Sequence, residues 1–396
     1  MCHVLALMQS CILYQNPASC VTVLDIPRSI EEAQGGLLAR LISSSPMEHP
    51  YPGVEPKSEK ASKSLGETSV DELLLQKHLE FALLEADRGL GDDKAWCLPR
   101  ITEEECCNAP SKRKRKRFDQ VASPDTSHDY SSVLQDGGPE AQTVHLLDQI
   151  TNKIHYHNLH SSSLAISVGD HHAQMPPKST VLQGEIALTL DTFVAVAPRF
   201  NCIIMDPPWP NRSARRKKSY GIAYGTSEIK NVLSLLPIQT HLADDGLVAV
   251  WVTNKPAFRE MLLGEDGLFE RWGVRFSEEW VWLKVTSRGD PICRLDSKWR
   301  KPYEILLVGR RFEGDRKGTV GDIKRRVIIG VPDLHSRKPN LSCIVQQVIG
   351  KENGAYEALE IFARNLTAGW WAWGNEALKF QMTKYWRGID ETNTPL

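Results

Sequence analysis

The tetrapeptide Asp206-Pro207-Pro208-Trp209 is the part of this chain whose residue types most clearly suggest chemistry. It follows an apolar run, Cys202–Met205, which has the pattern of a buried strand. A carboxylate, two prolines and an indole at the end of a strand predict a rigid, flat slot that suits a planar base carrying an amino group. By average residue frequencies, this tetrapeptide should occur by chance in roughly one chain in a thousand of this length.

The chemistry that such a slot favours is methylation of an aromatic amine by a sulfonium donor. The amine lone pair is delocalised into the ring, so two acceptors are needed to draw the nitrogen towards tetrahedral geometry. We expect the Asp206 carboxylate and the Pro207 carbonyl to be these acceptors, because proline fixes its own φ and restricts the preceding residue. Trp209 is expected to stack on the base, worth roughly 1–3 kcal/mol. Catalysis would then rest on positioning and polar stabilisation, without a metal. Taken alone, the tetrad also fits a plain turn in which Asp206 caps a helix.

The elements around the tetrad alternate between strand and helix patterns. Predicted strands are Phe200–Met205, Leu247–Val252, Glu279–Val285, Tyr303–Gly309, Ala358–Phe362 and Trp370–Trp373. Predicted helices are Ser227–Leu236, Pro256–Leu263 and Asn340–Ile349. This alternation indicates an α/β fold with a mainly parallel sheet. Ligands bind at the carboxyl ends of such strands, where Asp206 lies.

Residues 1–140 are expected to form a largely disordered N-terminal region. Leucine spacing predicts a helix near residues 69–88 with Ser69 as its N-cap. The unbroken basic run 112–117 indicates a nuclear import signal or a nucleic-acid tether, and we favour import and hence a nuclear location. Residues 141–196 are expected to pack on a methyltransferase domain at 197–386, with helical spacing at Val144–Ile154, and residues 387–396 to form a tail.

The chain resembles the S-adenosylmethionine-dependent adenine N6-methyltransferases of the β-type motif order. The segments that carry the resemblance, in the family's order, are Pro176–Ser179, Ile204–Trp209, Trp251–Asn254, Lys301–Glu304, His335–Pro339, Leu359–Asn365, Trp373–Glu376 and Leu378–Gln381. They cover residues 176–381 and make a plain turn at the tetrad a poor explanation. The resemblance implies a Rossmann-like fold, with methyl transfer to the N6 amine of adenine.

The resemblance also implies a set of cofactor-binding residues for S-adenosylmethionine. Asp206 and Pro207 would lie beside both methyl donor and base, and Lys338 would reach the donor's carboxylate. Glu360 and Phe362 would line the strand end nearby. The residues expected at the ribose and amino-acid portions are Arg364, Asn365, Asn375 and Glu376. Ile186 is expected at the adenine of the cofactor, although Glu185 stands where the family has an aspartate. Without the resemblance, Arg364 and Glu360 would be read as a surface ion pair. The chain has no G-x-G-x-x-G motif for the cofactor.

A basic and aromatic loop follows the tetrad and predicts a nucleic-acid substrate. Its candidate residues are Arg212, Arg215, Arg216, Lys217, Lys218 and Tyr220. A solvated loop without a ligand fits these residues equally well until substrate binds. A base within a duplex cannot enter the slot, so we expect unpaired or flipped adenine in RNA, with DNA a lesser candidate. The alternative is a catalytically silent nucleic-acid-binding scaffold of the same fold. A methyltransferase acting on a small amide is a third reading, which the basic loop disfavours.

Composition limits the remaining possibilities. The net charge is −1, so nucleic-acid binding must come from local patches. Nine cysteines without a C-x-x-C pair indicate reduced thiols in an intracellular protein. His155, His157 and His160 lack cysteine or acid partners nearby, so we predict no metal site. No apolar run is long enough to cross a bilayer, and the sequence identifies no protein partner.

Overall fold

The structure is a computed structural model. It describes residues 9–36, 39–52, 68–91, 95–103, 144–145, 154–210, 225–312, 323–352 and 354–388. The basic run 112–117, all but two residues of the expected tail, and the loop candidates Arg212, Arg215, Arg216, Lys217, Lys218 and Tyr220 lie outside the described residues. No helix in the described ranges is both long and apolar enough to cross a membrane.

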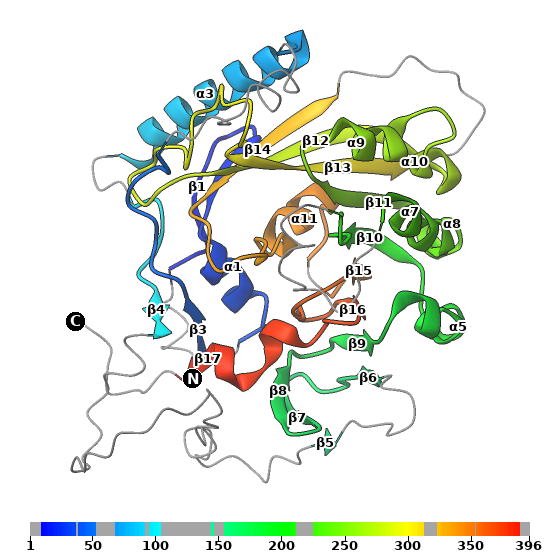
Figure 1. Ribbon diagram of the computed structural model, residues 1–396. Coiled ribbons are helices and arrows are strands. Elements are labelled where there is room, and N and C mark those ends of the chain that lie inside the picture. The colour runs from blue at the N-terminus through cyan, green and yellow to red at the C-terminus, as the bar shows by residue number, and fades with distance from the viewer. Residues whose placement is uncertain are drawn as a thin grey trace, which may run out of the picture.

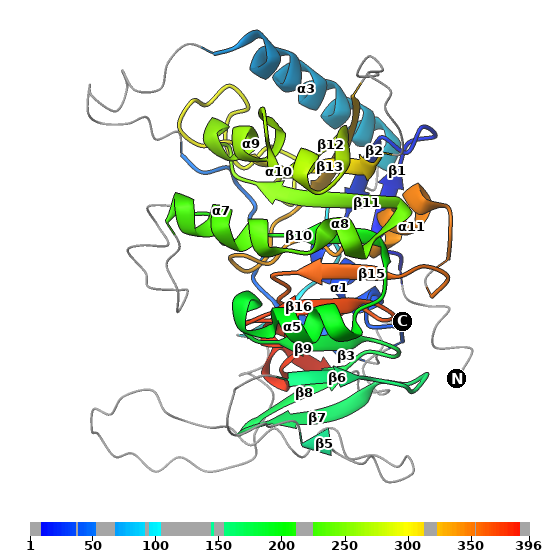
Figure 2. The same ribbon diagram turned by 90° about the vertical axis from the view of Figure 1, so that its right-hand side faces the viewer.

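A large mixed sheet runs through the molecule, in the order β1-β2-β14-β12-β13-β11-β10-β15-β16-β9-β6 (Figures 1 and 2). Its strands are β1 (Ile12–Gln15), β2 (Val21–Leu24), β6 (Ile154–His157), β9 (Thr180–Gln183), β10 (Phe200–Met205), β11 (Leu242–Val252), β12 (Val274–Lys284), β13 (Tyr303–Arg311), β14 (Lys324–Gly330), β15 (Ala358–Ile361) and β16 (Trp371–Gly374). Strand β10 pairs in parallel with β11 and β15, β15 with β16, and β16 with β9. Their carboxyl ends therefore lie at one edge, and the predicted α/β fold is confirmed.

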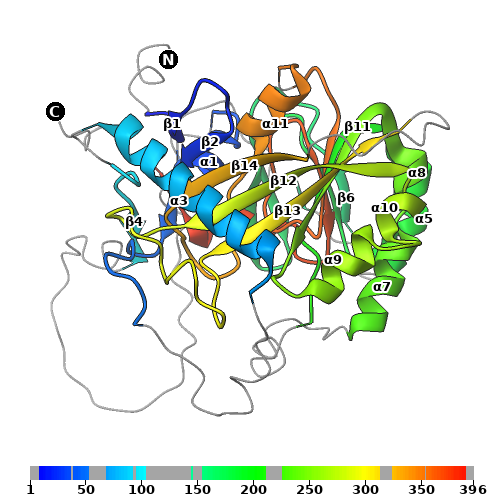
Figure 3. The ribbon, with the colours of Figure 1, turned by 90° about the horizontal axis from the view of Figure 1, so that it is seen from above.

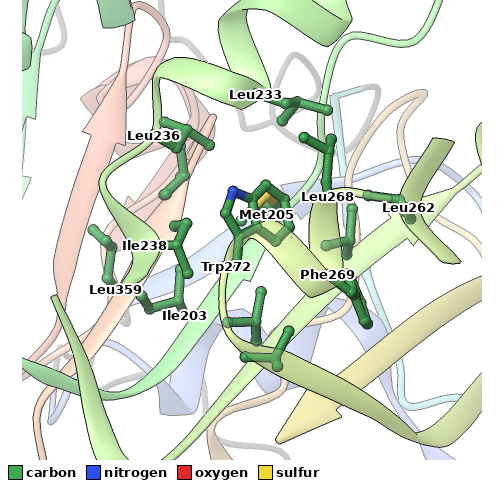
Figure 4. Packing of buried hydrophobic residues seen from close by; sticks show 14 of the residues in the cluster. Ile203, Met205, Leu233, Leu236, Ile238, Leu262, Leu268, Phe269, Trp272 and Leu359 are labelled. Carbon is green, nitrogen blue, oxygen red and sulfur yellow. The ribbon is translucent and has the colours of Figure 1, made fainter. Parts of the chain in front are cut away.

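Helices cover both faces of the sheet (Figure 3). One face carries α3 (Val70–Leu90), α5 (Ile186–Val196), α7 (Thr226–Leu235), α8 (Ile238–His241), α9 (Pro256–Leu263) and α10 (Leu268–Arg271). The other carries α1 (Ile26–Glu32) and α11 (Ser342–Ile349). Strand β10 is apolar from Cys202 to Met205 because this part is covered on both sides: Ile203 and Met205 face α7 to α10, and Cys202 and Ile204 face α11. Figure 4 shows side chains from α7 to α10 gathered around Met205.

The prediction of a largely disordered N-terminal region is wrong for the described residues 9–36 and 39–52. Strands β1 and β2 extend the large sheet, because β2 pairs in parallel with β14. The next strand, β3 (Ala39–Ser43), pairs with β4 (Ile101–Thr102) and with β17 (Trp386–Gly388) near the C-terminus. Helix α3 lies where the leucine spacing indicates, with the Ser69 side chain accepting from the amide of Glu72 at 3.2 Å.

Residues 154–196, which were expected to form a lead-in segment, contribute strands to the sheets themselves. Strands β6 and β9 form one end of the large sheet, so the expected domain boundary at 197 falls inside it. A small sheet contains β5 (Val144–His145), β7 (Leu164–Val168) and β8 (His171–Met175). The predicted helix at Val144–Ile154 is wrong at both of its ends, which lie in β5 and β6. Apolar spacing over so short a segment does not separate helix from strand.

Candidate active site

A pocket opens at the carboxyl ends of β10 and β15, beside the tetrad. Asp206 follows the last residue of β10, and Glu360 lies in β15, which is hydrogen-bonded to β10. The loop before α11 forms the facing wall. The lining residues are Ile204, Asp206, Trp251, Ser336, Arg337, Lys338, Pro339, Asn340, Leu341, Glu360, Phe362, Arg364, Asn365, Trp370 and Phe380. Residues from five separate segments therefore meet where parallel strands end.

Lys338 binds the Asp206 carboxylate from across the pocket. Its Nζ lies 2.8 Å from Asp206 Oδ2 and 3.1 Å from Glu304 Oε2, and 5.5 Å above the ring of Trp251. Lys284 donates to the other oxygen of Glu304. A carboxylate accepts through both oxygens, so Asp206 can bind a second donor at Oδ1 while Lys338 holds Oδ2.

Burial and neighbouring charges shift the pKa values of Glu304 and Lys338 in opposite directions. Burial alone would raise the pKa of Glu304, but the ammonium groups of Lys338 and Lys284 lower it to about 2. Burial alone would lower the pKa of Lys338, but Asp206 and Glu304 raise it above its ordinary value. Lys338 is therefore firmly protonated, and its charge is fixed beside Asp206.

The pKa of Glu360, which lines the pocket, is raised, whereas the pKa of Glu304 is lowered. Burial raises its pKa most, and the nearby Asp206 carboxylate raises it further. Arg364 and Lys338 lower it only in part, so the pKa is about 7. Two carboxyl groups at one strand end thus have different environments: Lys338 bonds directly to Asp206, whereas the described part of the chain shows no ion pair to the half-buried Glu360.

The two prolines and Trp209 form a tight turn that is anchored in the core. The amide of Trp209 donates to the Pro207 carbonyl at 2.7 Å. The indole Nε1–H donates to the Trp251 carbonyl at 2.7 Å, and the ring stacks on Phe258 with centroids 4.4 Å apart. Trp209 is only 6% exposed. The structure therefore corrects its expected role: it anchors the turn that aims Asp206, and too little of its ring is open to serve as a platform for a base.

The turn after β15 and the turn after β16 lie against each other beside the pocket. Phe362 has φ +59°, and Gly374 has φ +151°. A Cβ on Gly374 would lie 3.0 Å from Cα of Phe362, so only glycine allows this approach. Beyond these turns, Arg364 Nε lies 3.1 Å from Glu376 Oε2, and its Nη1 donates to the Ser336 carbonyl at 3.3 Å.

Comparison with known proteins decides the family. The family model described as MT-A70 matches residues 200–376. A protein of Cryphonectria parasitica called N6-methyladenosine RNA methyltransferase MTA1 is 39% identical over 95% of this chain and 94% of its own length. A protein of Pyricularia oryzae with the same name is 37% identical over 96% of this chain and 97% of its own length. This chain belongs to the MT-A70 family.

Membership in the MT-A70 family confirms the resemblance seen in the sequence. The matched segments also resemble methyltransferase-like protein four in particular. The human N(6)-adenine-specific methyltransferase METTL4 is 35% identical over 54% of this chain and 45% of its own length. The two fungal MT-A70 relatives match almost the whole chain, well beyond the residues that the family model covers.

Not every predicted site residue lines the pocket of this MT-A70 protein. Ile186 is the first residue of α5, and its side chain belongs to the same core cluster as Leu182 and Phe193, so its expected contact with the cofactor stays a prediction. Asn375 is exposed and Glu376 half-buried, next to the pocket rather than in its lining. The amide of Gly184 donates to the Gly374 carbonyl at 3.2 Å, which brings the start of α5 to the same rim.

Two residues at the site, Glu304 and Arg337, lie in segments that carry the family resemblance but were not among the predicted site residues. Glu304 lies in a segment that carries the family resemblance, and the structure shows that it holds Lys338. Arg337 precedes Lys338 and is buried with its side chain 1% exposed, in a cluster with Asp333 and Arg100. Its Nε and Nη2 have no hydrogen-bond partner among the described residues. Within the same residues, no group of three or more His, Cys, Asp or Glu side chains could hold a metal ion.

Proposed function

We propose that this protein transfers a methyl group from S-adenosylmethionine to the N6 amine of adenine in RNA. The observation that carries the proposal is the Asp206 carboxylate at the end of the central strand β10, with one oxygen bound to Lys338 and the other able to accept from an amine. Family membership and the names of the two near full-length fungal relatives support adenine in RNA. A DNA N6-methyl methyltransferase of Caenorhabditis elegans is 33% identical over 48% of this chain, which gives weaker support for DNA.

The pocket suits S-adenosylmethionine by the chemistry of its donors. Two arginines and one aspartate are buried together beside the pocket, and two nitrogens of Arg337 have no hydrogen-bond partner among the described residues. An anionic ligand group would satisfy this excess charge. Asn365 and Glu376 would bracket ribose hydroxyls near Arg364. When bound, S-adenosylmethionine supplies a methyl group on a positively charged sulfur.

The residues of the chain would position the amine rather than react with it covalently. Asp206 Oδ1 would accept one amino hydrogen. The Pro207 carbonyl would accept the other through its second lone pair, because its first already binds the Trp209 amide. Lys338 and the buried Trp209 fix the carboxylate and the turn before substrate arrives, so little reorganisation is needed.

A base in a stable duplex cannot reach this pocket, so the proposed substrate is unpaired or flipped adenine. The residues proposed to follow its phosphates are Arg212, Arg215, Arg216, Lys217, Lys218 and Tyr220. We also propose a nuclear location, which the basic run 112–117 supports.

The test is methyl transfer from labelled S-adenosylmethionine to matched single-stranded RNA, single-stranded DNA and duplex oligonucleotides. Asp206→Asn keeps the shape of the side chain and removes its charge, so we expect kcat to fall about 10²- to 10³-fold. Asp244→Asn is the matched control, because Asp244 is exposed and paired with Arg199 far from the pocket. Folding and binding of S-adenosylmethionine are measured for both variants.

Unchanged kcat in the Asp206 variant would refute the proposed role of the carboxylate. A wild-type protein that binds RNA and S-adenosylmethionine but transfers no methyl would favour the silent scaffold. Faster transfer to DNA than to RNA would overturn the choice of polymer, and equal transfer to a stable duplex would exclude the need for an unpaired base.

A further inference from the structure

Cys11 and Cys343 bring two thiols into contact although they lie 332 positions apart in the chain. Their Sγ atoms are 3.8 Å apart, and the thiol of Cys11 donates to the sulfur of Cys343. Cys11 directly precedes β1 and is 1% exposed, whereas Cys343 is the second residue of α11 and is half-buried. Within the described residues, no other pair of cysteine sulfurs is in hydrogen-bond contact.

The segment around Cys11 is held against both α1 and α11. The amide of Cys11 donates to Oε1 of Glu32, the last residue of α1, at 2.7 Å. Strand β1 then lies beside α11 (Figure 2), where Gln15 Nε2 donates to Gln347 Oε1 at 2.9 Å, one helical turn beyond Cys343. The two thiols therefore meet at a contact between β1 and α11 that other hydrogen bonds hold in place.

A disulfide needs only a small movement of these two sulfurs. The S–S bond is about 2.05 Å long, so the atoms must approach by about 1.8 Å from their present 3.8 Å. Rotation about a single Cα–Cβ bond displaces a sulfur by more than this distance. The backbone of β1 and α11 can therefore stay in place while the bond forms.

The two thiols differ in reactivity, and Cys343 is the better nucleophile. The hydrogen bond from Cys11 lowers the pKa of the Cys343 thiol most, and the backbone amides of Cys343 and Ile344 lower it further. Burial and the carboxylate of Glu32 oppose this shift without reversing it. The same hydrogen bond raises the pKa of Cys11. Cys343 is also the more exposed of the two, so an oxidant reaches it first.

We propose that Cys11 and Cys343 form a redox site at which hydrogen peroxide converts the two thiols into a disulfide. The Cys343 thiolate attacks one peroxide oxygen, the O–O bond breaks, and the leaving hydroxide takes up the proton that Cys343 released. The Cys11 sulfur then attacks the sulfur of the resulting sulfenic acid, and a second water leaves with the Cys11 proton. Two thiols are oxidised, and one peroxide is reduced to two waters.

The disulfide would join the N-terminal end of the sheet to one wall of the pocket. Residues 336–341 line the pocket and lead directly into α11, so the bond fixes this wall to the segment before β1. It also retains β1 on the sheet, where β1 is an edge strand that pairs with β2. The reaction needs only the two thiols, so the proposal stands whether or not the proposed methyl transfer is correct.

The test treats the reduced full-length protein with a small excess of hydrogen peroxide, alkylates the remaining thiols and identifies tryptic peptides by mass spectrometry. Trypsin leaves Cys343 as the single cysteine of peptide 338–351, and it leaves Cys11 in peptide 1–28 with two further cysteines. We expect these peptides to be joined, with fragment ions that place the bond at Cys11, and dithiothreitol to separate them. The oxidised protein should melt about 3–6 °C above the reduced protein, because the bond closes a long loop.

The variants Cys11→Ser and Cys343→Ser should each abolish the joined peptides and the rise in melting temperature. Cys20→Ser is the matched control, because it removes a half-buried cysteine from the same tryptic peptide as Cys11 and should leave both results unchanged. Melting of each reduced variant checks folding, and the half-buried position of Cys343 keeps the test valid if Cys11→Ser is unstable. Separate peptides in the wild type, a bond from Cys343 to Cys2 or Cys20 instead, or an oxidised protein that melts no higher would overturn the proposal.

Discussion

Glu360 provides a prediction whose size follows from the structure. Its carboxyl lines the pocket, and burial together with Asp206 raises its pKa to about 7. Replacing it by glutamine keeps the size of the side chain and removes the charge. The free energy of unfolding of the variant should therefore depend on pH differently from that of the wild type.

The sign follows from the two pKa values. Below the ordinary glutamate value of 4.5, Glu360 is protonated in both the folded and the unfolded state, and it has no effect. Between 4.5 and about 7 the folded state binds more protons, so the stability of the wild type falls as pH rises. Above pH 7 Glu360 is ionised in both states, and the full cost of burying its charge lowers the stability of the wild type. The difference corresponds to at most about 3 kcal/mol, and we expect about 1–3 kcal/mol because water reaches part of the side chain.

The assay is urea unfolding of wild type and Glu360→Gln at intervals from pH 4 to pH 8.5. The variant should match the wild type near pH 4 and exceed its stability by about 1–3 kcal/mol at pH 8. Glu265→Gln, a change at an exposed glutamate, is the control and should show no such divergence. A constant difference at all pH values would refute the reasoning. A variant that is less stable at pH 8 would show that Arg364 stabilises the ionised carboxylate more than burial opposes it.

Two further changes test the turns that shape the site. Trp209→Phe removes the buried hydrogen bond to the Trp251 carbonyl and should lower the free energy of unfolding by about 1–3 kcal/mol, measured by denaturant. Affinity for RNA should stay within twofold, and a large loss of affinity with unchanged stability would restore the stacking role. Gly374→Ala forces a Cβ towards Phe362 and should lower the melting temperature and weaken binding of S-adenosylmethionine, measured by calorimetry. An unchanged affinity would separate this turn from the cofactor site.

The central strands and helices were predictable because their local pattern agrees with their environment. Strand β10, Phe200–Met205, and helix α9, Pro256–Leu263, have the predicted bounds. Strand β10 is covered on both faces and therefore reads as an unbroken apolar run, while Pro256 at the first turn marks the start of α9.

Strands whose partners are distant could not be found in this way. Strand β14 begins with Lys324, Arg325 and Arg326, which suggest ordinary surface. In the structure Arg325 and Arg326 pair with the buried Glu279 and Glu278 of the neighbouring strand β12. The four residues of β2 are too few to show the alternation of a strand. Their strand conformation depends on pairing with β14.

The site was located from the sequence, but its internal contacts were not. The tetrad and the strand before it are enough to place Asp206 at a carboxyl end. The bond from Lys338 to Asp206 joins residues 132 positions apart, and no local pattern records it. The burial of Trp209 depends in the same way on the carbonyl of Trp251 and the ring of Phe258.

The pairing of β2 with β14 has a consequence for the order in which the chain assembles during synthesis. Val21 lies beside Val327, about 300 residues later, so the first strands leave the ribosome long before their partner exists. At the usual 5–20 residues per second, this interval is about 15 to 60 s. During that time the apolar segment Val21–Leu24 has no sheet to join, and it is open to chaperones. The closure of the N-terminus onto the sheet, together with the docking of α3, would then have to wait until β14 has been made.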